Sequence, residues 1–121
     1  AVFLTRDLGK TWQPHPTNRN TLIEPNCNAS LYRFDRPAGL SPVLLFANPH
    51  TQKGRTHHTI QVSFDDGLTW PDANHLLLDE GRGRGYPSLS RIGGNHIGIV
   101  YEGSRADLTF ERIALDELIP K

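Results

Sequence analysis

The chain has 121 residues, in which 13 lysine and arginine side chains are balanced by 13 aspartate and glutamate side chains. This length suits one domain, and the neutral balance does not indicate a nucleic-acid partner or an anionic membrane surface. The single cysteine, Cys27, excludes an intramolecular disulfide and is expected to be a small buried apolar residue. No apolar run is long enough to predict a membrane-spanning helix.

The first residues, A-V-F-L-T-R-D, lack the basic and apolar regions of a signal peptide. The sequence enters an apolar run at once, which is typical of a segment cut from a larger protein. Composition alone therefore leaves the cellular compartment undetermined.

Short apolar runs separated by Gly, Pro, Asn and Asp predict a chain built from β-strands. No window keeps the i, i+3, i+4, i+7 spacing of an amphipathic helix. In chain order, strands are expected at residues 2–4, 29–34, 43–47, 59–64, 75–78, 88–92, 96–101 and 108–114. The final D-E-L-I, residues 116–119, predicts one helical turn. The prolines fall between these runs or at their edges, where a missing backbone donor is tolerated, so the expected fold class is all-β.

One eight-residue pattern occurs twice, as T-R-D-L-G-K-T-W at residues 5–12 and as S-F-D-D-G-L-T-W at residues 63–70. The matched positions are Thr5, Asp7, Gly9, Thr11 and Trp12 in the first octet and Ser63, Asp65, Gly67, Thr69 and Trp70 in the second. A repeat spaced by about fifty residues is typical of the blades of a β-propeller.

The octet predicts a rigid hairpin turn. Its aspartate is expected to accept hydrogen bonds from backbone N–H groups two residues on, its glycine to adopt a positive φ, and its hydroxyls to tie the flanks. Its tryptophan is expected to pack between neighbouring sheets. We therefore interpret both octets as structural.

These octets resemble the Asp-box, also called the BNR repeat, of sialidases and other β-propellers, which lies on the outer rim of the propeller. The second half is similar to the C-terminal part of a sialidase catalytic propeller, because it carries in order F-A-N-P, Arg55, T-H-H-T-I-Q-V-S-F, the second octet, G-Y-P-S-L, I-G-I-V-Y-E-G-S and D-L-T-F-E-R-I-A-L-D-E-L. The resemblance implies a partial six-bladed β-propeller with about two antiparallel, four-stranded blades. Residues 1–25 would end one blade, residues 26–80 form a complete blade, and residues 81–121 form most of the last.

The reaction that the resemblance implies is retaining hydrolysis of terminal sialic acid, in which a tyrosine is the nucleophile. A carboxylate nucleophile would be repelled by the carboxylate on the anomeric carbon of sialic acid, whereas a phenol would not. Tyr86, in R-G-Y-P-S, matches that tyrosine. A phenol needs a base or nearby cations to react at neutral pH, and the activating glutamate is expected upstream of this chain.

Arg55 matches the third arginine of the family's triad, which clamps the substrate carboxylate with paired donors. Arg82 and Arg84 are rival candidates beside Tyr86, ranked lower because a glycine-rich loop holds side chains poorly. Glu102 matches the glutamate that orients the first arginine of the triad. Without the resemblance, each of these residues would be interpreted as a solvated surface group.

Some parts of the family's site have no counterpart in the sequence. These are the first two arginines, the acid/base aspartate and the activating glutamate, so the chain is expected to be catalytically silent by itself. A proline, Pro87, also follows Tyr86 where the family commonly has a small residue, and it is expected to push Tyr86 into an extended conformation.

No metal or cofactor is expected, since the adjacent His57 and His58 would point to opposite faces of a strand. The expected partners are a sialylated glycan and the remaining blades of the same propeller, with no nucleic acid and no membrane. The resemblance implies a secreted or extracytoplasmic location. Two alternatives stay open: a non-catalytic Asp-box propeller that binds glycan or protein, and a scaffold assembled from several copies of the chain.

Overall fold

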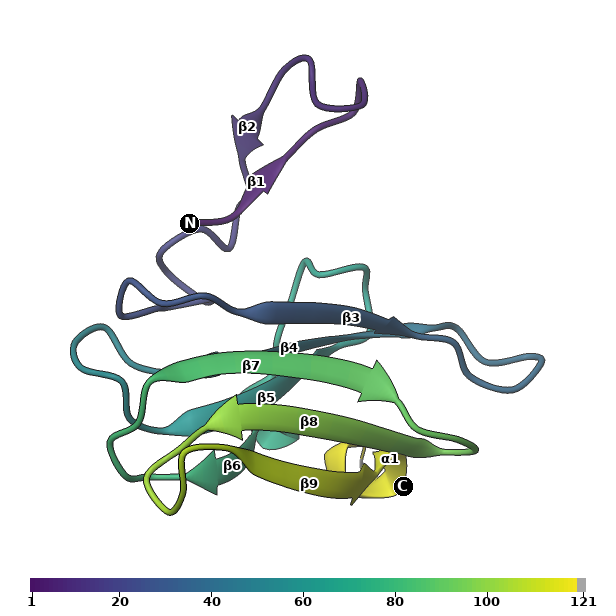
Figure 1. Cartoon of the computed structure of the whole chain (residues 1–121). Helices are drawn as coiled ribbons and strands as arrows, with labels where there is room; N and C mark the ends of the chain where they lie inside the picture. Colours follow the sequence, from purple (N-terminus) through teal and green to yellow (C-terminus); the bar gives the residue numbers. More distant parts are fainter. Residues whose placement is uncertain (120–121) are drawn as a thin grey trace.

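The structure is a computed structural model that describes residues 1–119. It contains three antiparallel sheets and two short helical segments (Figure 1). The strands are β1 (Phe3–Leu4), β2 (Gln13–Pro14), β3 (Ser30–Phe34), β4 (Val43–Pro49), β5 (His58–Ser63), β6 (Leu76–Asp79), β7 (Gly85–Arg91), β8 (His96–Glu102) and β9 (Thr109–Ala114). The helical segments are η1 (Asp72–Asn74) and α1 (Leu115–Leu118). The all-β prediction is therefore confirmed.

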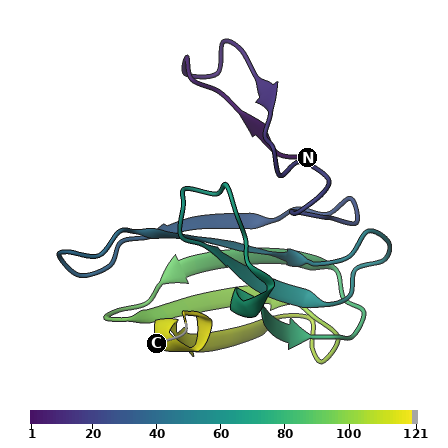
Figure 2. The ribbon, with the colours of Figure 1, turned by 180° about the vertical axis from the view of Figure 1, so that it is seen from behind.

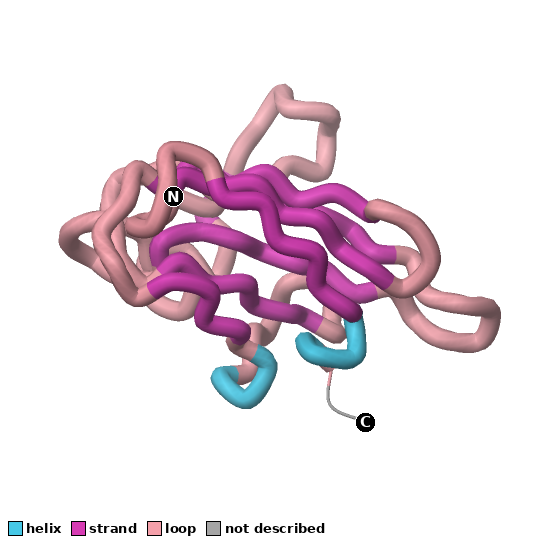
Figure 3. The backbone as a smooth tube through the Cα atoms, turned by 60° about the horizontal axis from the view of Figure 1, so that its bottom comes forward, coloured by secondary structure: helices cyan, strands magenta, loops and turns pink. Residues whose placement is uncertain are grey.

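The two larger sheets pack face to face. One has the order β3-β4-β5-β6 and the other the order β7-β8-β9, while β1 and β2 form a separate hairpin that projects away from both (Figures 1 and 2). The backbone N–H of Leu89 in β7 donates to Ser30 Oγ at the start of β3, at 3.0 Å, and joins the two sheets. In Figure 3, η1 and α1 lie on the same side of the sheets, and Asn74 Nδ2 donates to the carbonyl oxygen of Leu118 at 3.0 Å.

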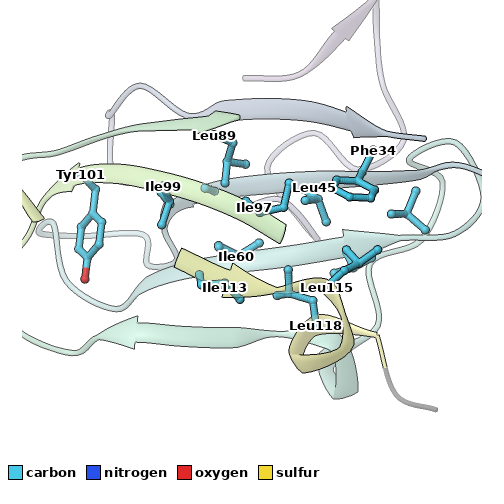
Figure 4. Close-up of a cluster of buried hydrophobic side chains, with 13 residues drawn as sticks. Phe34, Leu45, Ile60, Leu89, Ile97, Ile99, Tyr101, Ile113, Leu115 and Leu118 are labelled. Carbon is cyan, nitrogen blue, oxygen red and sulfur yellow. The ribbon is translucent and has the colours of Figure 1, made fainter. Parts of the chain in front are cut away.

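The core fills the space between these two sheets because alternate residues of each strand point toward the facing sheet. Figure 4 shows the side chains of this cluster meeting from both sides. Its members are Phe34, Val43, Leu45, Ala47, Ile60, Val62, Leu89, Ile97, Ile99, Tyr101, Ile113, Leu115 and Leu118.

A matched pair of substitutions tests this core. Leu45 in β4 is 0% exposed, whereas Leu77 in β6 is 45% exposed. We expect Leu45→Ala to lower the free energy of unfolding by about 2–5 kcal/mol, since it leaves a cavity, and Leu77→Ala to lower it by less than about 1 kcal/mol. Urea denaturation measures both values, and equal losses would contradict the assignment of the core.

The strands differ from the sequence prediction mainly at their ends. The prediction missed β2, which is only two residues long and includes Pro14, paired with Phe3. Strand β4 continues to Pro49, which pairs with His58 at its end. Strand β7 begins at Gly85, three residues before the predicted start, and α1 begins one residue before the predicted helical turn.

The two octet turns have the same hydrogen-bonding pattern. In the second, Asp65 Oδ1 accepts from the Thr69 N–H at 2.8 Å, Asp65 Oδ2 accepts from Thr69 Oγ1 at 2.6 Å, and Ser63 Oγ accepts from the Gly67 N–H at 2.8 Å. In the first, the corresponding Thr11 and Gly9 contacts measure 2.8, 2.7 and 2.8 Å. The aspartate thus bonds an N–H four residues on, not two, because the glycine at positive φ turns the backbone back toward it. The Thr69 side-chain and backbone hydrogen bonds lower the pKa of Asp65, as expected for a structural role.

The two octet tryptophans differ in burial. Trp70 is 5% exposed and packs edge-on against Phe46, with ring centroids 5.9 Å apart, and against Leu22. Trp12 is 58% exposed, so the expectation that both rings pack between sheets is wrong for this ring within residues 1–119. The physical reason is its position immediately before β2, in the β1–β2 hairpin, because this hairpin extends away from the other sheets (Figure 1).

Candidate active site at one end of the sheets

One loop and two strand ends, all at the same end of the two larger sheets, carry the predicted site residues. Arg55 lies in the loop between β4 and β5, Tyr86 is the second residue of β7, and Glu102 is the last residue of β8. In Figure 1 these segments gather at the left of the view. The second octet turn follows the other end of β5, so it lies away from this group by roughly the length of a six-residue strand, about 20 Å.

The Arg55 side chain is fixed by backbone carbonyl oxygens from two other segments. Its Nη1 donates to the carbonyl oxygen of Arg84 at 2.9 Å, and its Nη2 donates to that of Asn26 at 3.1 Å. Its own carbonyl oxygen accepts from the Gly83 N–H at 2.9 Å. The guanidinium fork is thus oriented by two other chain segments, which distinguishes it from a freely solvated loop arginine.

Arg55 and Tyr86 lie together. The guanidinium carbon is 5.0 Å from the centroid of the Tyr86 ring, within the range of a cation–π contact. The Tyr86 hydroxyl, followed by the electrostatic effect of the nearby Cys27, raises the pKa of Arg55, and the guanidinium is a permanent cation. A substrate anion that reaches the Tyr86 hydroxyl would therefore also meet a fixed positive charge.

Tyr86 lies in a β-bulge. Gly85 pairs with Glu102 and Ser88 pairs with Val100, so two residues of β7 are opposite one residue of β8. Tyr86 has φ 48° and Gly85 has φ 86°. The expected extended conformation of Tyr86 is therefore wrong, because the backbone must accommodate the extra residue, and this requirement outweighs the preference imposed by the following proline. The side chain is 47% exposed at the open end of the sheets.

Close packing holds the first residue of the bulge. A Cβ atom at Gly85 would lie 2.8 Å from Cys27 Sγ and 3.0 Å from Pro49 Cγ, so only glycine fits here. Cys27 is half-buried rather than buried as expected, and its Sγ donates to the carbonyl oxygen of Arg84 at 3.5 Å. Non-glycine residues at positive φ cost about 1–3 kcal/mol and are concentrated at functional sites. Tyr86 is such a residue, and its surroundings hold it in place.

Glu102 lies beside this pair and borders an open cleft of about 280 Å³. Arg82, Arg84 and Asp107 line the same cleft. The Glu102 side chain is half-buried, and its Oε2 is buried with no hydrogen-bond partner among residues 1–119. A buried carboxylate oxygen without a donor is costly, so this atom needs a donor that the described part of the chain does not supply.

The two rival arginines, Arg82 and Arg84, differ from Arg55 in what they contribute to the site. The side chains of Arg82 and Arg84 are both exposed. Arg84 contributes its backbone carbonyl oxygen, which accepts from Arg55 and from the Cys27 thiol. Sequence reasoning missed these contacts because neither a carbonyl oxygen nor a single cysteine carries a recognisable pattern.

Within residues 1–119, no group of three or more His, Cys, Asp and Glu side chains could hold a metal ion. His58 is buried at the start of β5, whereas His57 precedes the strand, has φ 55° and is exposed, so the two histidines are not neighbours on one strand as expected. No helix in the described part of the chain has the length and apolar character needed to cross a membrane.

Comparisons with known proteins were made on sequence and structure. No family model matches the sequence. The chain is 46% identical over 122 residues to a sialidase of Bacteroides fragilis (strain YCH46) and 35% identical over 105 residues to a sialidase of Micromonospora viridifaciens, matches that cover 98% and 84% of this chain. Its fold matches that of the solved Hadza microbial sialidase Hz136 with a TM-score of 0.88, at 45% identity over 98% of the chain.

The antiparallel all-β architecture and these similarities define a segment consistent with part of a sialidase propeller. The chain belongs to the sialidase family, which confirms the resemblance found in its sequence. It spans 22% and 16% of the lengths of the two curated relatives and 23% of the solved chain. The activity, substrates and partners of the whole protein are therefore proposals.

Proposed function

We propose that this chain forms the C-terminal part of the active site of an exo-α-sialidase-like retaining glycoside hydrolase. Its substrates would be glycoconjugates with terminal sialic acid. The observation that carries the proposal is the pairing of Arg55 with Tyr86, with the guanidinium carbon 5.0 Å from the ring centroid, at the end of the sheets where Glu102 also lies.

Arg55 would bind the substrate carboxylate. Its guanidinium is already oriented by the carbonyl oxygens of Arg84 and Asn26, so little side-chain entropy would be lost when the anion binds. Because the carboxylate is attached to the anomeric carbon, fixing it near Arg55 would also place that carbon near Tyr86.

Tyr86 would be the nucleophile. Its phenolic oxygen would form a bond to the anomeric carbon as the bond to the leaving alcohol breaks, while a glutamate base takes the phenolic proton and an aspartic acid protonates the leaving oxygen. Water would then attack the same carbon and give one proton to that aspartate as the bond to the tyrosine oxygen breaks, while the glutamic acid returns its proton to that oxygen. Two displacements at one carbon give net retention of configuration.

Glu102 would hold another arginine of the site. Its buried Oε2 lacks a donor among residues 1–119, and a guanidinium from another part of the protein would supply one. That arginine, the acid, the base and a further arginine would come from the remaining blades, so the chain alone should be inactive. In this proposal residues 1–25 end one blade, residues 26–80 form a complete blade and residues 81–121 form most of the last, with Asp-box turns in the first two. The protein would act in a secreted or extracytoplasmic location.

The full-length protein that contains this chain tests the proposal with a fluorogenic sialoside. We expect turnover, and NMR of the first product should show the same anomeric configuration as the substrate. Binding to sialylated glycans without turnover would contradict the enzymatic proposal and would favour a non-catalytic propeller that binds glycan. Inversion of configuration would contradict the nucleophilic role of Tyr86.

A further inference from the structure

A buried carboxylate lies behind the candidate site. Asp79, the last residue of β6, is 6% exposed. Its Oδ1 accepts from the Gly81 N–H at 2.8 Å and from Ser104 Oγ at 2.8 Å. Its Oδ2 accepts from the Ser104 N–H at 2.7 Å and lies 3.0 Å from Ser104 Oγ. Both carboxylate oxygens are thus bonded to loops rather than to solvent.

These bonds join the two loops next to Tyr86 and Glu102. Gly81 belongs to the loop that leads from β6 into β7, and Ser104 belongs to the loop that leaves β8. In Figure 1 both loops lie at the left end of the sheets, next to the tip of β6. Asp79 is therefore a bridge between the segments immediately before Tyr86 and immediately after Glu102.

The two loops pack too closely for any residue other than glycine. A Cβ atom at Gly81 would overlap Ser104 Oγ, and one at Gly83 would overlap the carbonyl oxygen of Glu102. Gly103 is equally confined, since its Cβ would lie 2.6 Å from Asp79 Oδ2. Such an approach brings polar backbone groups together, and it persists only where their hydrogen bonds are satisfied.

The bridge extends to the loop that carries Arg55. The Gly83 N–H donates to the carbonyl oxygen of Arg55 at 2.9 Å, and the carbonyl oxygen of Arg84 accepts from the Arg55 guanidinium at 2.9 Å. The loop that Asp79 anchors at Gly81 therefore also fixes Arg55.

The carboxylate is stabilised in its charged form. Burial alone would raise the pKa of Asp79, but the hydrogen bonds from Ser104 and Gly81, with a smaller contribution from the charge of His58, lower it overall. An ionised carboxylate accepts at both oxygens, whereas the amide of asparagine would place a donor against the donors of Ser104 or Gly81. Charge and shape are thus both needed at this position.

We infer that Asp79 is a positioning residue, and this inference rests on the proposed function. Asp79 clamps the β6–β7 and β8–β9 loops so that Tyr86 and Glu102 are held in register with Arg55. It touches no substrate. Small displacements of groups that must align with a reacting atom cost about 100-fold in rate.

The test compares Asp79→Asn with two other variants of the full-length protein. We expect Asp79→Asn to lower kcat by about 10- to 100-fold with a smaller change in KM, and Ser104→Ala, which keeps the backbone bond, to lower it less. Leu45→Ala provides the stability control, because it weakens the core between the sheets and should leave kcat of the folded enzyme unchanged. In a Tyr86→Phe background, Asp79→Asn should cause a smaller further loss than in the wild-type protein, since part of its effect acts through Tyr86.

Hydrogen exchange gives a second readout that does not depend on activity. Asp79→Asn should speed amide exchange in residues 80–86 and in residues 103–108, whereas Leu45→Ala should not act selectively on them. Unchanged exchange in both loops would overturn the clamp. If the wild-type protein is active and Asp79→Asn has the same kcat, the positioning role of Asp79 is overturned and the proposed function stands. If the wild-type protein is inactive, the proposed function itself is contradicted.

Discussion

Tyr86→Phe should lower kcat/KM of the full-length protein on a sialoside by roughly 1,000-fold or more, because it removes the oxygen that forms the covalent intermediate. The ring and its contact with the Arg55 guanidinium, 5.0 Å away, would remain. We therefore expect the loss in kcat, with substrate affinity largely kept. A continuous fluorogenic assay at saturating and at low substrate separates the two parameters.

The matched control for this substitution is Tyr32→Phe. Tyr32 lies in β3 and packs at the edge of the core, away from the three segments that carry the site residues. Tyr32→Phe removes one hydroxyl and should leave kcat/KM within about threefold of the wild-type value, as is usual for a substitution remote from the reacting groups. Full activity of Tyr86→Phe would show that another group attacks the anomeric carbon.

Arg55→Lys should raise KM by roughly 10- to 100-fold with a smaller change in kcat. Lysine keeps the positive charge but cannot make the paired bonds of a guanidinium to a carboxylate. It would also lose one of the two bonds that hold the side chain to the carbonyl oxygens of Arg84 and Asn26. Initial rates over a wide range of substrate concentration measure this effect.

The rival arginine supplies the comparison. Arg84→Lys leaves the backbone carbonyl oxygen that Arg55 uses, and the Arg84 side chain itself is exposed. We expect KM to change by less than about threefold. A larger rise in KM for Arg84→Lys than for Arg55→Lys would show that the substrate carboxylate binds Arg84, and would contradict its assignment to Arg55.

Much of the fold could be predicted because it depends on local patterns. Apolar runs bounded by turn residues located most strands within one or two residues, since the outer strands alternate between a buried and an exposed face while β5 is buried on both. The octets predicted their turns, since the hydroxyl, carboxylate and glycine that form each turn lie within a few residues. The sialidase resemblance itself is confirmed by the relatives.

The geometry of Tyr86 could not be predicted from local sequence. Pro87 favours an extended residue before it, yet the bulge between β7 and β8 gives Tyr86 a φ of 48°. Register across two strands sets this conformation, and a single sequence does not reveal register. The roles of Arg55, Tyr86 and Glu102 in catalysis stay predictions.

Asp79 shows a similar limit. In the sequence it is one acidic residue before a glycine-rich loop, with nothing to mark it as buried. Its partner Ser104 lies 25 residues further on and contributes both a side chain and a backbone N–H. The spacing of Gly81 and Gly83 signals close packing only when the second loop is known.

Covalent trapping tests the central claim most directly. A sialosyl fluoride with a second fluorine at the neighbouring ring carbon reacts with a retaining sialidase but slows the release of the intermediate, since fluorine disfavours the oxocarbenium-like transition state. After trapping of the full-length protein, trypsin should release Gly85–Arg91 as a seven-residue peptide. We predict that this peptide gains the mass of the fluorinated sugar on Tyr86. Turnover of a sialoside with the label on any other residue would contradict the account.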